Sequence, residues 1–169
     1  TYPLPEAQLD RFMFNIFVDY PEEDEELDII KLTTADHEAT VDAVISGEDI
    51  MALQEIVRRV PVADHVIDYA RNLARASRPK KPNAPDFVKQ MVAWGAGPRA
   101  GIYLITAAKA RAILQGRCHV TNGDVTQVAL PVLRHRVITT FNAEAAGVTS
   151  DEIVSMLIDA VNPTEKLDV

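Results

Sequence analysis

Apolar residues recur at helical spacing along most of the chain, and polar capping patterns mark the expected starts of several helices. After Ser46-Gly47-Glu48-Asp49, apolar residues continue at this spacing to Val60. The segments 121–124 and 149–152 also place a threonine three residues before an acid. Because such a pair satisfies free amides at a helix start, each of the three patterns predicts a helix. The chain is therefore expected to be mainly α.

Five further helices are predicted from a proline, an aspartate or a glycine at their starts. The expected ranges are 6–11, 21–32, 64–74, 86–94 and 97–116. The acidic run at 22–26 could form a ligand patch, but acids at a helix start complement the helix dipole, and we favour that interpretation. Pro131 is expected to kink or divide the helix that follows Thr121. Residues 142–148 are expected to form a coil.

One segment breaks the helical pattern, because residues 12–18 are apolar at almost every position. A strand with one solvent-facing side would alternate, so this run predicts a strand covered on both faces, as in a parallel sheet. Parallel neighbours require helical crossovers, and the remaining chain supplies none. We therefore expect an orphan strand whose sheet lies in an α/β part upstream of Thr1, so that the sequence looks like a piece of a larger protein.

Two further patterns predict a small two-stranded sheet beside the helices. Residues 40–45 and 116–120 are short, partly β-branched runs, each expected to form one strand. Between the helices, residues 78–85 contain three prolines, which exclude a helix there.

The stretch Trp94-Gly95-Ala96-Gly97-Pro98-Arg99-Ala100 places an arginine where a helix begins. Gly97 is expected at the N-cap and Pro98 at the first helical position. A cation in the first turn opposes the helix dipole by roughly 0.3–1 kcal/mol, unless an anion lies nearby. Free amides at such a start bind phosphate well, and a guanidinium binds it with two N–H groups. Arg99 is thus either part of a phosphate site or a solvated arginine.

Composition narrows the function classes only in part. With 169 residues, 47% of them hydrophobic, the chain has the make-up of a globular protein, and no apolar run approaches the roughly 20 residues of a membrane span. A net charge of −8 disfavours a general nucleic-acid or anionic-membrane binder. The single cysteine, Cys118, excludes an internal disulfide and suits a reducing, cytoplasmic compartment.

The sequence contains few candidates for catalysis by the chain itself. Its four histidines, at 37, 65, 119 and 135, are scattered, so a metal site is not expected. The sequence has neither a Gly-x-Ser-x-Gly elbow nor a Gly-x-x-x-x-Gly-Lys-Ser/Thr loop. We therefore expect no phosphate-binding loop and no ATP hydrolysis by these residues alone.

Arg11 is the second arginine in a distinctive context. It closes the short helix 6–11 directly before the expected strand. Cations are favourable at helix C-termini, so Arg11 could cap this helix or pair with Asp10. Its place at the rim of a parallel sheet equally suits contact with a ligand or a neighbouring subunit.

Three motifs together resemble the MoxR-type AAA+ ATPases. Residues 3–12, PLPEAQLDRF, are similar to the segment that follows the sensor 1 strand of that family. Residues 94–100, WGAGPRA, resemble its sensor 2 motif, and residues 133–136, LRHR, a third family stretch. The resemblance extends to about residue 140 and implies that the Walker A loop, the Walker B acids and the sensor 1 asparagine lie upstream of Thr1.

The resemblance also implies roles for particular residues. Arg99 would be the sensor 2 arginine, contacting the γ-phosphate of ATP, with Gly97 and Pro98 at the start of its helix. Arg11 would be the arginine finger, reaching the ATP of the adjacent subunit. Both roles require the planar fork of a guanidinium. Tyr20-Pro21 would be the hinge of the helical lid.

At the level of the whole protein, the resemblance implies three parts and a ring. Residues 1–20 would end the α/β core, 21–140 would form the helical AAA+ lid domain, and 141–169 a linker and C-terminal helix. The complete protein would bind ATP and Mg²⁺ and hydrolyse ATP as a homo-oligomeric ring, a hexamer, neither cofactor being held by this chain alone. Chaperone-like remodelling or maturation of protein complexes would be its function, with von Willebrand factor A domain proteins as partners.

Two other classes of function remain open from the sequence. The chain could be a helical interaction module without nucleotide function, in which Arg99 is a surface residue. It could also be a nucleic-acid-binding domain that uses Lys80, Lys81, Arg134 and Arg136, although the negative net charge argues against it. Our preferred interpretation of Arg134 and Arg136 is structural, as cations partnered by acids of the lid.

Overall fold

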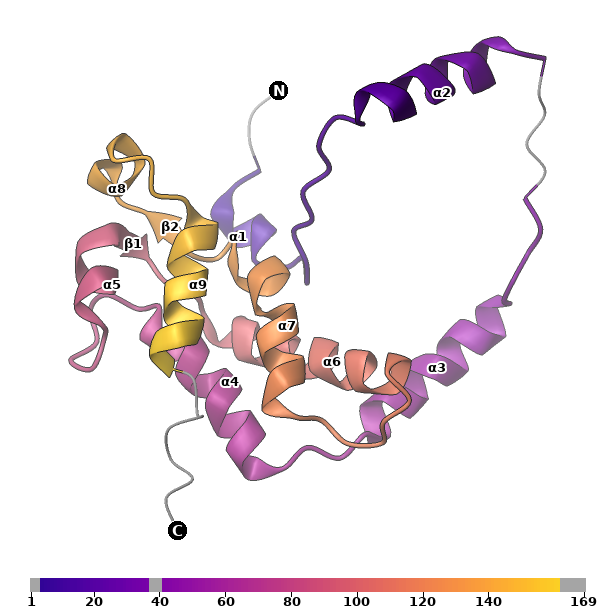
Figure 1. Ribbon diagram of the computed structural model, residues 1–169. Coiled ribbons are helices and arrows are strands. Elements are labelled where there is room, and N and C mark those ends of the chain that lie inside the picture. Colours follow the sequence, from indigo (N-terminus) through magenta and orange to yellow (C-terminus); the bar gives the residue numbers. More distant parts are fainter. Residues whose placement is uncertain (1–3, 37–40, 162–169) are drawn as a thin grey trace.

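The computed structural model describes residues 4–36 and 41–161, which are mostly helical (Figure 1). The elements, in chain order, are α1 (Glu6–Leu9), α2 (Glu23–Thr34), α3 (Gly47–Arg59), α4 (Asp64–Ala76), α5 (Asp86–Met91), β1 (Val92–Trp94), α6 (Pro98–Leu114), α7 (Asn122–Leu133), β2 (Ile138–Thr139), α8 (Phe141–Ala145) and α9 (Ser150–Val161). The mainly α prediction, with a small two-stranded sheet, is confirmed.

Residues 60–161, which we call the body, share one hydrophobic core. Helices α6 and α9 each pack against both α4 and α7. α4 contributes an apolar stripe at helical spacing that includes Val66 and Leu73, both fully buried. α9 contributes Ile153 and Leu157, so the body's core extends to the last helix described. The domain boundaries at 20/21 and 140/141 themselves stay predictions.

A buried carboxylate joins the two most closely packed helices of the body. Asp124, near the start of α7, accepts hydrogen bonds from Arg111 of α6 (2.9 Å) and from Arg117 of the connecting loop (2.7 Å). It also accepts from the amide and hydroxyl of Thr121, completing the predicted capping box. Arg117 and these Thr121 bonds hold the pKa of Asp124 well below its usual range.

The predicted helix starts are largely correct. Ser46 and Asp49 form a capping box at α3, and Thr149 exchanges hydrogen bonds with Glu152 at α9. Gly97 is the N-cap of α6 and Pro98 its first residue, as expected. α7 continues through Pro131 to Leu133, so the proline does not divide it.

The strands lie elsewhere than predicted. β1 pairs antiparallel with β2, so the helix expected to run to Trp94 ends at Met91. No strand forms at 12–18, at 116–120 or in the described part of 40–45. A strand needs a neighbour for its backbone groups, and none of the segments described lies beside these runs as a strand. The coil expected at 142–148 is also wrong, because α8 occupies its first part, capped by the Thr140 hydroxyl.

The described residues between 18 and 59, which we call the arm, leave the body at α2 and return to it at α3, which packs against α6. Figure 1 shows α2 well away from the helices of the body, with α3 leading back toward them. Neither α2 nor α3 contains a buried residue, although both carry apolar side chains such as Leu27, Ile30 and Ile56. α2 starts with a capping box between Glu22 and Glu25, so its helix is specified locally rather than by packing.

Candidate functional site

The loop before α6 is fixed by the end of α4. Ser77 is fully buried; its hydroxyl donates to the Ala74 carbonyl (2.8 Å) and accepts from the Ala96 amide (2.9 Å). Arg78 Nε donates to the Ala96 carbonyl at 2.8 Å. At Gly95, a Cβ would lie 2.2 Å from the Ser77 carbonyl oxygen, so this close approach requires glycine. The start of α6 is therefore held in one position by backbone contacts.

Arg99 lies in the first turn of α6 and pairs with an aspartate from the other end of the chain. Its Nη1 donates to Asp10 Oδ2 at 2.6 Å, and its side chain is 44% exposed. The carboxylate thus supplies the anion that a cation at a helix N-terminus needs. No side chain caps α6 by a hydrogen bond. Arg99 is neither freely solvated nor buried in the helical bundle.

Arg136 binds the other side of the same carboxylate. Its side chain is 1% exposed, and its acceptors are Asp10 Oδ1 (2.9 Å) and the backbone oxygens of Asp10, Phe12, Met13 and Val132. These five bonds match the five N–H groups of a guanidinium. Burial lowers the pKa of Arg136, while the Asp10 bond acts in the opposite direction. Arg136 therefore attaches residues 10–13 to the body through their backbone.

Arg134 attaches the next residues of this segment. Its Nε and Nη2 donate to the two oxygens of Asp151 on α9, at 3.1 and 2.9 Å. Its Nη1 donates to the Asn15 carbonyl at 3.3 Å, and its guanidinium lies 4.3 Å from the centre of the Phe17 ring. Arg134 is engaged structurally, as expected, but its acidic partner Asp151 lies on α9, beyond the range 21–140 predicted for the lid. Arg136 pairs with Asp10, also outside the predicted lid.

His135, between the two arginines, contacts the same segment. Its Nε2 lies 3.1 Å from the Phe12 carbonyl, which makes Nε2 the protonated nitrogen, and burial lowers the pKa of the imidazole. Its buried Nδ1 has no hydrogen-bond partner among the residues described. LRHR is thus a binding motif for residues 10–15, and its arginines are engaged within the chain.

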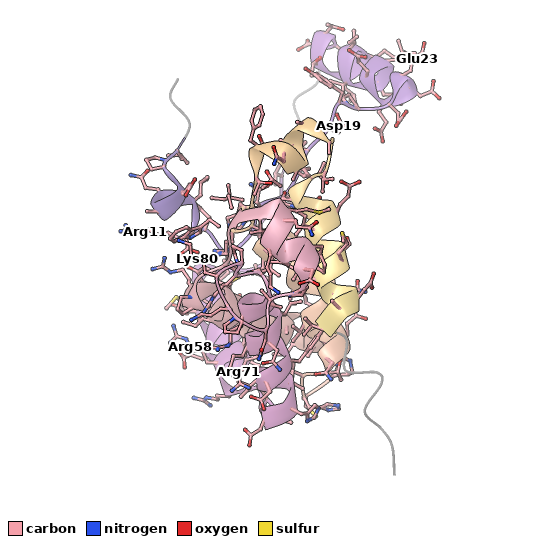
Figure 2. All side chains as sticks on the ribbon, turned by 90° about the vertical axis from the view of Figure 1, so that its left-hand side faces the viewer. Arg11, Asp19, Glu23, Arg58, Arg71 and Lys80 are labelled. Atoms are coloured by element: carbon pink, nitrogen blue, oxygen red, sulfur yellow. The ribbon has the colours of Figure 1, made fainter. Side chains whose placement is uncertain are left out.

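Arg11 is exposed and lies at the edge of the molecule beside α1 (Figure 2). Its carbonyl accepts from the Tyr103 hydroxyl of α6 at 2.8 Å. Asp10 pairs with Arg99 and Arg136 rather than with Arg11, so the pairing considered from the sequence does not occur. Within the described ranges, no ion pair engages the Arg11 guanidinium.

The predicted hinge lies in an extended stretch between the attached segment and α2. Tyr20 is 93% exposed, its amide donates a hydrogen bond to the Asp19 carboxylate at 2.8 Å, and Pro21 is exposed as well. In Figure 2, Asp19 and Glu23 flank this dipeptide on the path toward α2, well apart from Arg11. Its role as a hinge stays a prediction.

Two hollows adjoin the start of α6. One, of about 290 Å³, is lined by residues that include Asp10, Gly95, Gly97 and Arg136. The other is an open groove of about 660 Å³ between α3, α4 and α6, and its lining combines apolar residues with several arginines, among them Arg58 and Arg71 (Figure 2).

The described residues contain no cluster of three potential metal ligands. No described helix is both long and apolar enough to cross a membrane.

Comparison with known proteins identifies the class of this helical body. Residues 86–157 match the family described as AAA lid domain. They include β1, the loop that begins α6, Arg99 and the LRHR motif, whereas Asp10 and Arg11 precede the matched region.

The chain is also similar to longer proteins over nearly its whole length. It is 37% identical to the chaperone MoxR1 of Mycobacterium tuberculosis, the match covering 95% of this chain and 42% of that protein. It is 29% identical to the protein MoxR of Paracoccus denitrificans, covering 97% of this chain and 51% of that one. A crystal structure of a "putative ATPase" from Cytophaga hutchinsonii superposes with a TM-score of 0.86 at 30% identity, covering 95% of this chain and 49% of that one.

Residues 86–157 therefore form an AAA lid domain, and the resemblance of the chain to MoxR proteins predicted from its motifs is confirmed. The chain spans about half the length of the curated relatives it matches. The residue roles that the resemblance implied are not tested by these similarities.

Proposed function

We propose that this chain is the lid of a ring-forming AAA+ ATPase whose ATP and Mg²⁺ are bound mainly by a core outside these residues. In this proposal Arg99 is the sensor 2 arginine and contacts the terminal phosphate. The observation that carries the proposal is the half-exposed guanidinium at the glycine-opened start of α6, already paired with an oxyanion. Gly97 and Pro98 leave that helix end without a side-chain cap, which suits an anionic ligand.

Arg11 is proposed as the arginine finger that acts on the ATP of the adjacent subunit. Its side chain is exposed at the periphery, while the Tyr103 hydroxyl binds its backbone carbonyl. The guanidinium can therefore reach an adjacent subunit from a backbone held in one position. An arginine supplied in this way stabilises charge on the transferred phosphoryl group and contributes about 10³–10⁵ in rate. Bound ATP supplies the phosphoryl group; the chain's residues position charge around it.

The arm fits this proposal because its apolar side chains need a cover. Leu27, Ile30 and Ile56 are each about half exposed. The core of the same protein is the proposed cover, with Tyr20-Pro21 as the hinge between core and lid. The complete protein then acts as a hexameric ring in chaperone-like remodelling, a proposal supported by its similarity to the chaperone MoxR1 of M. tuberculosis. Its proposed partners are von Willebrand factor A domain proteins, and its proposed compartment is the cytoplasm.

The test uses the complete protein with its ATPase core. Arg11→Ala should abolish turnover while leaving the dissociation constant for ATP unchanged, because the finger acts in trans. Arg99→Ala should weaken the binding of ATP more than that of ADP, since ADP lacks the terminal phosphate. The matched control is Arg71→Ala, which removes an exposed arginine paired with Asp68 on α4.

Two results would contradict the proposal. Loss of ATP binding in Arg11→Ala would place this residue in the nucleotide site of its own subunit. A micromolar dissociation constant for ATP measured on the isolated 169 residues would show that the lid binds nucleotide without a core. Titration of both proteins with ATP by calorimetry measures these outcomes.

A further inference from the structure

The Asp10 carboxylate bridges two arginines that differ sharply in how firmly they are bound. Its Oδ1 accepts from Arg136 Nε at 2.9 Å, and its Oδ2 accepts from Arg99 Nη1 at 2.6 Å. The three residues come from the end of α1, from the segment after α7 and from the first turn of α6. The carboxylate is itself 31% exposed on its side chain, so one side of the cluster is open to solvent.

The two bonds are unequal because the arginines have different surroundings. Arg136 is buried, and its other four hydrogen bonds go to backbone oxygens, so it remains in place whatever happens at Oδ2. Arg99 has a single hydrogen bond here and is 44% exposed. Exposed ion pairs contribute little to stability, and a more highly charged anion displaces one carboxylate readily.

We propose that Asp10 is a latch that competes with the terminal phosphate of a bound nucleotide for Arg99. The inference rests on the proposed role of Arg99 and adds a residue that controls it. With no terminal phosphate present, Arg99 stays on Asp10 Oδ2. A nucleoside triphosphate draws the guanidinium away, and Asp10 keeps its bond to Arg136. Asp10 is thus a positioning residue that sets the preference for triphosphate over diphosphate.

The latch also connects Arg99 to the proposed arginine finger. Asp10 is adjacent in sequence to Arg11, whose carbonyl is bound by Tyr103, one turn along α6 from Arg99. Arg11 is therefore tied to α6 in two places, through the Asp10–Arg99 pair and through the Tyr103 hydroxyl. A bound triphosphate breaks the Asp10–Arg99 pair and leaves the Tyr103 hydrogen bond in place. The nucleotide bound by one subunit therefore affects Arg11, which is proposed to act on the ATP of the adjacent subunit.

The experiment measures the dissociation constants of a non-hydrolysable ATP analogue and of ADP for the complete protein. Asp10→Asn removes the charge that competes for Arg99, so the analogue should bind about threefold to tenfold more tightly, with ADP changed less than about twofold. Asp10→Glu keeps the charge and should restore a preference close to the wild type. Asp68→Asn, which breaks a similarly exposed aspartate–arginine pair on α4, is the matched control and should change neither constant.

A second arm separates failure of this inference from failure of the proposed function. In an Arg99→Ala background, Asp10→Asn should have no further effect on the analogue. If Arg99→Ala weakens binding of the analogue but Asp10→Asn alone leaves that binding unchanged or weakens it, the latch is refuted and the sensor role stands. If Arg99→Ala has no effect on the analogue, the sensor role itself fails.

Folding of the variants is checked independently of nucleotide. The bonds from Arg136 to the backbone of residues 10–13 do not depend on the Asp10 side chain, so Asp10→Asn should keep this segment attached. Amide hydrogen exchange of wild-type residues 9–12 gives a second readout that needs no substitution. Exchange should rise with the ATP analogue and not with ADP; equal exchange in the two complexes would overturn the latch.

Discussion

The body and the arm contain helices with comparable apolar content but opposite degrees of burial. Leu73 of α4 is fully buried against the other helices of the body, whereas Leu27 of α2 is 49% exposed. Both helices begin with acids that complement the dipole, so local signals specify both. The difference teaches that sequence pattern determines that a helix forms, while the presence of a packing partner determines whether its apolar face is covered.

The largest expected effect is a loss of stability from truncating a leucine in the body, compared with the same change in the arm. Leu73→Ala should lower the free energy of unfolding of the body by about 2–5 kcal/mol, because it leaves a cavity among packed helices. Leu27→Ala should change it by less than about 0.5 kcal/mol, since its side chain has no such surroundings here. Chemical denaturation of this chain measures both. Equal losses would mean that α2 belongs to the same cooperative unit as the body.

A charge buried in the body gives the next largest effect. Asp124→Asn should cost about 1.5–3 kcal/mol at neutral pH, because Arg111 and Arg117 lose their shared carboxylate. The folded-state pKa of Asp124 is lowered, so its contribution is complete above the unfolded value of about 3.9 and is lost as the pH falls through the folded value.

The difference in unfolding free energy between wild type and Asp124→Asn should therefore shrink below about pH 4. Denaturation at pH 7 and pH 3 measures it. Asp68→Asn, at an exposed pair, is the control and should show little change at either pH. If the difference in unfolding free energy between wild type and Asp124→Asn is the same at both pH values, the ionised Asp124 carboxylate is not its source.

The close approach before α6 predicts a somewhat smaller loss. Gly95→Ala should destabilise the body by about 1–3 kcal/mol, because the new Cβ meets the Ser77 backbone. Gly101→Ala, within α6 and with no atom near the added Cβ, should instead stabilise it by about 0.5–1 kcal/mol. Thermal unfolding distinguishes the two signs. A neutral Gly95→Ala would mean that the loop can shift away from α4.

The smallest effect concerns the arm alone. Ser46→Ala removes the cap of α3 and should weaken that helix by about 0.5–2 kcal/mol without changing global unfolding. Amide exchange of residues 50–56 should accelerate while that of α4 stays constant. Faster exchange in α4 as well would show that the arm and the body unfold together, against the distinction drawn between them.

The fold could be predicted as far as local chemistry specifies it. Capping pairs and helical spacing located α3, α6, α7 and α9 because those signals act within a few residues. The strands could not be located, since a strand depends on a partner distant in sequence, and β1 pairs with a segment more than 40 residues away. The apolar run at 12–18 predicted a strand whose sheet the described residues do not contain.

The candidate site was predictable in its arginines but not in its acid. Arg99 is conspicuous because a cation at a helix start opposes the dipole. Asp10 gives no such signal, as it lies 89 positions away and its sequence neighbour Arg11 suggested a different pair. Arg136 was placed among structural cations, yet its four hydrogen bonds to residues 10–13 depend on tertiary contacts that spacing does not encode.

Attachment of Phe12 through its carbonyl oxygen makes the identity of its own side chain largely irrelevant to docking of the segment. Arg136 would find the same oxygens if Phe12, which is 59% exposed, were exchanged for almost any other amino acid. A library randomised at this position should thus yield mostly folded members. The outward surface at Phe12 can therefore vary at little structural cost.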